Sequence, residues 1–185
     1  MNIDLTKDAV STAKRLIGYR LYTVEPNGTK IGGTIIETEA YNQDDAASHS
    51  YKGKTPRTEV MFGPAGHIYV YFTYGMHWCM NIVVGEEGRG EAVLIRALIP
   101  DSGVDIIRKR RKNKPDHELT NGPAKVCQAL AVTGIDNGAK INNSRFLILP
   151  PLQQLTYEAT ERIGITKDTH RLWRFVAKDS TVLRH

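Results

Sequence analysis

The segment "GHIYVYFTYGMHWCMNIVVG" (residues 66–85) carries the strongest β-strand signal in the chain. Its first half alternates between two faces of a sheet, with Tyr69, Tyr71 and Thr73 on one and Ile68, Val70, Phe72 and Tyr74 on the other. Gly75 separates this run from a second apolar run that ends at Val83. The segment therefore predicts a protruding β-hairpin with Gly75 at its tip.

Two more strand regions surround this hairpin. Residues 19–41 predict another hairpin that turns at Pro26-Asn27-Gly28, and residues 91–100 predict a short apolar strand. Residues 42–64 between them are polar and broken by glycine and proline, so a long surface loop is expected. Residues 172–184 predict a closing strand.

Helical spacing of apolar residues predicts three helices. The first covers residues 4–18, and the second begins at 104 and runs into the basic segment that ends at 114. The third covers residues 121–134, with Pro123 in its first turn and Gly134 at its end. Because the chain has 185 residues and no repeat or linker, we expect one α+β domain over residues 1–185.

The composition is that of an ordinary globular protein, with a formal net charge of +5 that mildly favours a polyanionic partner. No apolar run approaches the ~18 residues of a membrane span, and the N-terminus does not read as a signal peptide, so no membrane association is expected. The two cysteines lie far apart in apolar contexts and the six histidines lack metal-binding spacing. We therefore expect free buried thiols, no metal and no cofactor.

The segment "GGTIIETEAY" (residues 32–41) predicts a pocket wall. Alternation places Ile35, Glu37, Glu39 and Tyr41 on one face, which describes a strand face that leaves the core and enters a cavity. At the rise of a β-strand, the Cα atoms of Glu37 and Glu39 lie ~6.7 Å apart. A pair of carboxylates at this spacing suggests glycosidase-type chemistry, with either or both glutamates taking part.

Large apolar residues gather at the predicted hairpin tip, where Tyr74, Met76 and Trp78 follow one another closely. Proteins that deform DNA insert such side chains between base steps. The alternative, that these side chains fold back onto the core, is equally compatible with the sequence.

Two basic features offer phosphate contacts. The helix that opens at "NGPAK" presents free backbone N–H groups beside Lys125, an arrangement that can hold one phosphate. The basic run of residues 108–114 could neutralise phosphates, although such a run is more often a solvated surface.

Several of these segments, in this order, resemble the alkyladenine (3-methyladenine) DNA glycosylase family, which occurs in mammals and many bacteria. The resemblance runs from about residue 12 to the C-terminus and includes "ETEAY", "HS", "TPRTEVMFGPAGHIYVYFTYGMHWCMNIV", "AVLIRALIP", "NGPAKVCQAL" and "WRF". It implies a mixed domain around a curved, partly barrel-like antiparallel sheet with flanking helices. It also implies a monofunctional hydrolase that flips alkylated or deaminated purines out of duplex DNA and cleaves the N-glycosidic bond, which starts base excision repair.

The resemblance also assigns roles to individual residues. Glu39 would activate the water, Arg96 would help to hold it, and Glu37 would have a supporting role. The base-binding pocket would consist of Tyr41, His49, Tyr71 and Asn81. Tyr74 would intercalate into the DNA, and the DNA backbone would contact Met76, Gly122 and Lys125. A backbone carbonyl near Ala177 would help to position the water.

The spacing from Glu39 to His49 is one residue shorter than in the mammalian enzymes, and the long N-terminal extension of those enzymes is absent. The resemblance therefore favours a bacterial cytoplasmic protein that reaches the nucleoid through DNA and acts as a monomer on duplex DNA that contains damaged purines. Two other functions are open to the residues alone: a glycosidase that acts on a small nucleoside or sugar with Glu37 and Glu39 as a pair, and a non-catalytic module that binds distorted DNA.

Overall fold

The computed structural model describes residues 3–178, which form an antiparallel β-sheet of eight strands with three α-helices. The strands are β1 (Arg20–Val24), β2 (Lys30–Tyr41), β3 (Ile68–Thr73), β4 (His77–Val83), β5 (Ala92–Ser102), β6 (Phe146–Leu149), β7 (Tyr157–Thr160) and β8 (Arg174–Ala177). The helices are α1 (Ala9–Leu16), α2 (Val104–Arg110) and α3 (Pro123–Leu130). The predicted α+β class with a curved antiparallel sheet is confirmed.

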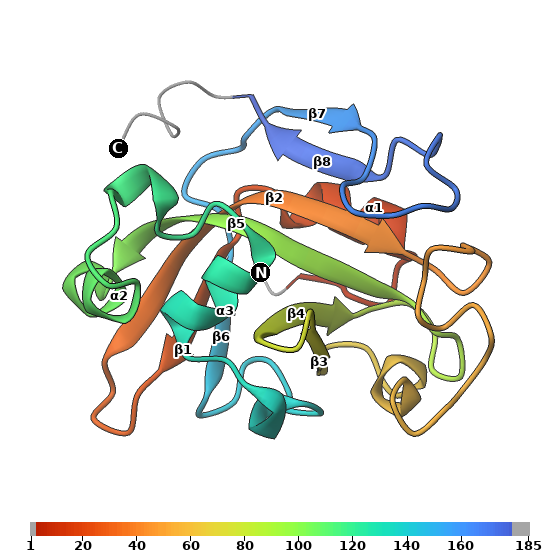
Figure 1. The fold of residues 1–185 in the computed structure, drawn as a ribbon, viewed down its shortest axis with the longest axis horizontal. Coiled ribbons are helices and arrows are strands. Elements are labelled where there is room, and N and C mark those ends of the chain that lie inside the picture. Colours follow the sequence, from red (N-terminus) through yellow and green to blue (C-terminus); the bar gives the residue numbers. More distant parts are fainter. Residues whose placement is uncertain (1–2, 179–185) are drawn as a thin grey trace.

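The two longest strands, β2 and β5, pair along most of their length and form the centre of the sheet. On the other edge of β2, residues 30–34 pair with β1 and residues 37–39 pair with β8, so the sheet branches there. The hairpin of β3 and β4 continues the sheet beyond β5, and β7 lies beside β8 (Figure 1). β2, through its partner β5, therefore links the hairpin to the C-terminal strands β8 and β7.

Two irregularities sit where β2 changes its partner. Ile36 is an extra residue between the pairs Ile35–Leu98 and Glu37–Ala97, and Arg96 is an extra residue on the opposite strand between Ile95 and Ala97. The first bulge breaks the alternation, so Ile35 joins the hydrophobic core rather than the face of Glu37. The prediction that these two side chains share a face is wrong, because a period of two holds only in a regular strand.

The helices are shorter than the sequence predicts. α1 begins only after Asp8, whose carboxylate accepts a hydrogen bond from Ser11 N–H at 2.9 Å, so the expected cap at residues 4–6 is wrong. α3 ends at Ala131, which adopts a left-handed conformation with φ of 51°, rather than at Gly134. Gly134 instead lies under the Trp78 ring, where a Cβ atom would come within 2.7 Å of the indole.

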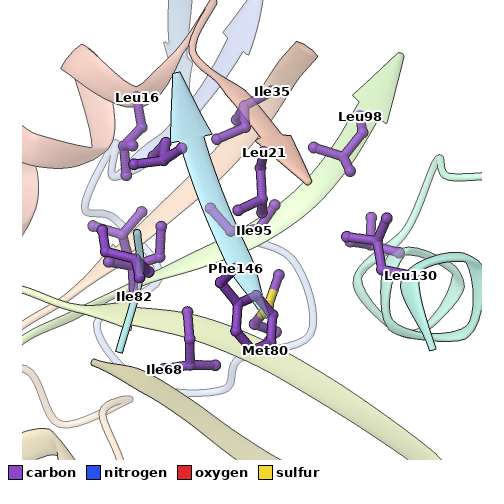
Figure 2. Close-up of a cluster of buried hydrophobic side chains, with 14 of the residues drawn as sticks. Leu16, Leu21, Ile35, Ile68, Met80, Ile82, Ile95, Leu98, Leu130 and Phe146 are labelled. Atoms are coloured by element: carbon purple, nitrogen blue, oxygen red, sulfur yellow. The ribbon is translucent and has the colours of Figure 1, made fainter. Parts of the chain in front are cut away.

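The core lies between the curved sheet and its helices (Figure 2). Leu16 of α1 and Leu130 of α3 belong to one buried cluster with side chains from several strands, among them Phe146 and Met80. α3 packs against β4 and β5, and α1 packs against β2 (Figure 1). Since this burial fixes the backbone of β2, β4 and β5, the side chains on their opposite face are held in a defined arrangement.

The hairpin predicted around Gly75 is present, and Tyr69, Tyr71 and Thr73 share a face as expected. Tyr74 does not continue the alternation, because β3 ends at Thr73 and Tyr74 lies in the turn. Both Tyr74 and Gly75 have positive φ angles, of 50° and 66°, as a tight turn of the I′ type requires. A tyrosine rarely adopts this conformation, so the turn stores strain at an exposed position.

The sequence interpretation did not include β6 and β7, which are four residues each. The closing strand is shorter than predicted, and residues 179–184 of that prediction lie outside the described residues. The long loop after β2 is present and contains one short 3-10 turn, Glu59–Phe62. Among the helices described, none is long and apolar enough to cross a membrane.

Replacing Gly33 with alanine should destabilise the fold severely. Its Cβ atom would lie 1.8 Å from the backbone oxygen of Ile99, and two central strands would have to separate. We expect the free energy of unfolding to fall by about 2–4 kcal/mol, as measured by urea denaturation. The control is Gly122→Ala, where no atom lies closer than 3.8 Å and the cost should stay below about 1 kcal/mol, which is typical of alanine at a helix N-cap. Equal stability of the two variants would contradict the close packing of β2 on β5.

Candidate active site

Glu39 is a fully buried carboxylate surrounded by donors from three parts of the chain. The Tyr41 hydroxyl donates to Oε2 at 2.7 Å, and Ile163 N–H donates to Oε1 at 2.8 Å. Arg96 Nη1 lies 3.3 Å from the same Oε1. A buried charge without such partners would be very costly, so these contacts fix the carboxylate in one orientation.

Glu39 opens into a cavity of about 260 Å³, a size that suits one small aromatic group. The cavity floor is a row of side chains that cross the sheet from strand to strand, because Glu39 pairs with Leu94, Leu94 with Asn81, and Asn81 with Tyr69. Seven residues predicted for the site line this one cavity: Glu39, Tyr41, His49, Tyr71, Tyr74, Asn81 and Arg96. The cavity thus joins β2, β3, β4, β5 and the loop after β2.

Arg96 connects the two glutamates of "ETEAY". Its Nε donates to Glu37 Oε1 at 2.9 Å, and Arg174 Nε donates to the same oxygen at 2.6 Å. Glu37 therefore faces two guanidinium groups, and it is not among the residues that line the cavity. This geometry favours a supporting role for Glu37 and gives no support to a catalytic pair of Glu37 and Glu39.

Arg96 lies on the cavity face of β5, as does Leu94 two residues before it. It is also the extra residue of the bulge in this strand, and its guanidinium spans the gap between Glu37 and Glu39. Bulges are frequent next to functional sites.

His49 lies at the rim of the cavity between two tyrosines and an arginine. Its Nδ1 is 3.1 Å from the Tyr69 hydroxyl, and its ring stands edge-on to the Tyr71 ring at 4.6 Å between centroids. Arg57 Nη2 is 3.4 Å from Nε2 and can only donate, so Nε2 is the acceptor and Nδ1 carries the proton. His49 is exposed at this rim, but partial desolvation of its ring, together with the Arg57 charge, lowers its pKa to about 4.

Asn81 and Tyr71 are fixed in the cavity wall. Asn81 is nearly fully buried and its Nδ2 donates to the backbone oxygen of Tyr69 at 3.2 Å, which sets the orientation of the amide. Burial, followed by the neighbouring Cys79 thiol, raises the pKa of the Tyr71 hydroxyl, so this ring stays neutral. Both cysteines are buried and free, as the sequence indicates.

The sequence left two alternatives open for the large side chains at the hairpin tip, exposure to solvent or packing on the core, and each holds for some of them. Tyr74 and Met76 are 81% and 69% exposed. Trp78 folds back instead, with its ring 4.7 Å from that of Phe72 and its edge against the core. Tyr74 therefore stands at the mouth of the cavity, free to meet a partner.

The predicted backbone contacts lie outside the cavity. Met76 lines a separate groove between the hairpin and α3, Gly122 caps the start of α3, and Lys125 Nζ lies 2.7 Å from Asn121 Oδ1. The neighbouring Pro123 does line the cavity, so the start of α3 is at its rim. Ala177 pairs with Tyr157 in the sheet and is not among the cavity residues, so the predicted contribution of a backbone carbonyl near it stays a prediction.

Much of the basic run of residues 108–114 forms ion pairs and hydrogen bonds within the protein. Arg108 pairs with Asp105 and Asp116, and Arg110 pairs with Glu25. Arg111 donates to the backbone oxygen of Leu119 at 2.9 Å. These three arginines fasten α2 to its neighbours, which favours the structural alternative over phosphate binding.

The residues that sequence reasoning missed at the site include Asp45, Arg162 and Ile163. Arg162 and Asp45 form a fully buried ion pair behind Tyr41, and Ile163 supplies the N–H that binds Glu39. No periodic pattern marks them, because their loops approach Glu39 only in the folded chain. Within residues 3–178, no group of three or more His, Cys, Asp or Glu side chains could hold a metal ion.

The charge state of His49 can be tested by NMR titration of its imidazole. We expect a midpoint near pH 4, so that the ring is neutral at pH 7. Arg57→Gln should raise the midpoint part of the way toward 6.5, because one of the two causes of the shift is removed. A midpoint at or above 6.5 in the unaltered protein would contradict the contacts described for this ring.

Comparison with known proteins identifies the family of the chain. The family model for methylpurine-DNA glycosylase matches residues 3–181. A protein of Carboxydothermus hydrogenoformans provisionally named 3-methyladenine DNA glycosylase is 47% identical over 177 residues, which cover 94% of this chain and 92% of the relative. Proteins with the same provisional name are 45% identical in Nitrosospira multiformis and 44% in Methanoculleus marisnigri, each over 94% of this chain and over 88% and 92% of the relative. The chain belongs to the methylpurine-DNA glycosylase family.

Proposed function

We propose that this protein flips a damaged purine out of duplex DNA and that Glu39 activates the water that cleaves its N-glycosidic bond. Family membership makes the chain a DNA glycosylase, a hydrolase of that bond. The observation that carries the mechanism is the position of Glu39, fully buried at the end of a cavity with aromatic walls and held by three donors. The proposed substrate is duplex DNA with an alkylated or deaminated purine, bound by a monomer.

The proposed first step is base flipping, because the glycosidic carbon is shielded inside a stacked duplex. Extrusion costs a few kcal/mol, and less for a damaged base. Tyr74 would stack in the vacated space, since its ring is exposed at the tip of a short, rigid turn beside the cavity. The N–H groups at the start of α3, with Lys125 and Met76, would contact the backbone of the same DNA.

The flipped base would stack between the rings of Tyr41 and Tyr71, which both line the cavity. Stacking of a base on an aromatic side chain is worth ~1–3 kcal/mol and tolerates different bases. Asn81, with its amide fixed by Tyr69, would contact the edge of the base and select among purines. His49 is neutral in the DNA-free protein and would serve as part of the wall through its bond to Tyr69.

Hydrolysis would then proceed through a state with positive charge on the sugar. The Glu39 carboxylate would take a proton from the attacking water and stabilise this charge. Arg96 would hold the carboxylate and the water, while Glu37 and Arg174 keep Arg96 in place.

Glu39→Gln should abolish excision of hypoxanthine from a synthetic duplex, because an amide cannot accept the proton from water. We expect the single-turnover rate to fall by at least about 100-fold, while binding to the same duplex is retained. Glu37→Gln is the matched control and should lose much less activity. Full excision by Glu39→Gln would overturn the mechanism, and loss of binding by this variant would favour a structural role.

Tyr74→Asn should separate stability from DNA engagement. Asparagine tolerates the left-handed conformation at this position, so the variant should unfold at the same temperature as the original protein or higher. Without the ring, excision of hypoxanthine at limiting protein concentration should fall about tenfold or more. Unchanged excision by this variant would exclude Tyr74 as the intercalating residue.

A further inference from the structure

Behind the cavity wall lies an ion pair that the proposed chemistry does not use. The side chains of Arg162 and Asp45 are both fully buried, and both terminal nitrogens of the guanidinium donate to the carboxylate. Arg162 also donates to the backbone oxygens of Ala40 at 3.0 Å and Asp168 at 3.4 Å. These bonds hold the cation in one place within the protein.

The guanidinium of Arg162 stacks on the ring of Tyr41, with 4.6 Å between its central carbon and the ring centroid. Tyr41 lines the cavity and Arg162 does not, so the ring separates the buried cation from the cavity. Burial and Glu39 raise the pKa of Tyr41, and the charge of Arg162 opposes this shift. The charge of Arg162 therefore acts on the Tyr41 side chain.

An aromatic face attracts a cation through the negative charge of its π electrons. When one face already carries a cation, the opposite face is a weaker partner for a second cation. N-alkylated purines are positively charged, whereas deaminated purines such as hypoxanthine are neutral. The two substrate classes thus differ in charge, and a cation behind Tyr41 acts on a charged base and not on a neutral one.

We propose that Arg162 determines substrate specificity by disfavouring cationic purines, relative to neutral ones, on the cavity face of Tyr41. This inference rests on the proposed stacking of the flipped base against Tyr41. Arg57 also approaches a stacking ring, at 5.8 Å from the centroid of Tyr71, but it is exposed and lines the cavity. An exposed arginine such as Arg57 is free to change its rotamer when a base enters. The buried, hydrogen-bonded Arg162 is held in place, so it is the cation that acts on a bound base.

The test compares single-turnover excision of 7-methylguanine, which is cationic, with that of hypoxanthine from otherwise identical duplexes. Asp45→Asn combined with Arg162→Gln replaces the ion pair by a neutral amide pair and leaves no buried charge unpaired. The ratio of the 7-methylguanine rate to the hypoxanthine rate should rise about three- to tenfold. A purely structural role of the pair lowers both rates together and leaves the ratio unchanged, which would overturn the proposal.

The matched control is Asp136→Asn combined with Arg145→Gln. This pair also joins an arginine to a buried aspartate, and Arg145 also stacks on an aromatic ring, that of Phe146. Phe146 does not line the cavity, whereas Tyr41 does. The ratio of this control should equal that of the unaltered protein. An equal rise in both double variants would contradict the assignment to Arg162.

If the first double variant does not fold, Asp45→Leu combined with Arg162→Met decides the question, because an apolar pair often replaces a buried ion pair without loss of stability. It also removes the cation behind Tyr41, so the ratio should rise, and an unchanged or lower ratio overturns the inference. Failure of the proposed function has a different signature, namely full excision of hypoxanthine by Glu39→Gln. The two failures are therefore distinguishable with the same duplexes.

Discussion

The burial of the Glu39 carboxylate constrains everything around it. A buried negative charge needs donors, and each of its donors comes from a different segment: Tyr41 from the end of β2, Arg96 from β5, and Ile163 from the loop before β8. If any of these segments moved, the buried carboxylate would lose one of its three donors. The carboxylate and the backbone around the cavity therefore hold each other in place.

The irregular parts of the sheet lie beside these charges. β2 changes partner from β1 to β8 beside Glu37, and the two bulges lie at that point. Arg96, the extra residue of the β5 bulge, bridges Glu37 and Glu39 there. Arg174 of β8 then balances the second glutamate. Glu39, Arg96, Glu37 and Arg174 thus form a row of alternating charges where three strands meet, and each charge has a partner.

The outer part of the site has a different character. The hairpin tip exposes Tyr74 in a strained turn, while its base is anchored by Tyr69 and by the contact of Trp78 with Phe72 and Gly134. Rigid support below and an exposed ring above are what insertion into a base stack requires. The strain costs stability, and the well-packed core of the sheet can bear that cost.

By itself, the sequence determined the hairpin, the α+β class and most of the cavity wall. Tyr69 and Tyr71 alternate within a strongly apolar strand, and "ETEAY" places Glu39 and Tyr41 two residues apart, so local periodicity was sufficient for these side chains. The family resemblance supplied Arg96, His49 and Asn81, all of which line the cavity. Their roles stay predictions.

Only the tertiary structure decided the rest. The bulges at Ile36 and Arg96 depend on strand pairing, and alternation alone therefore misplaced Ile35. α1 begins after Asp8 and α3 ends at Ala131, and helical periodicity alone marks neither residue. Ile163, Arg162 and Asp45 reach the site from loops more than 100 positions apart in the chain, and no local pattern encodes such a meeting. The physical reason is that buried charges choose their partners across the fold, whereas a sequence pattern reports only neighbours along the chain.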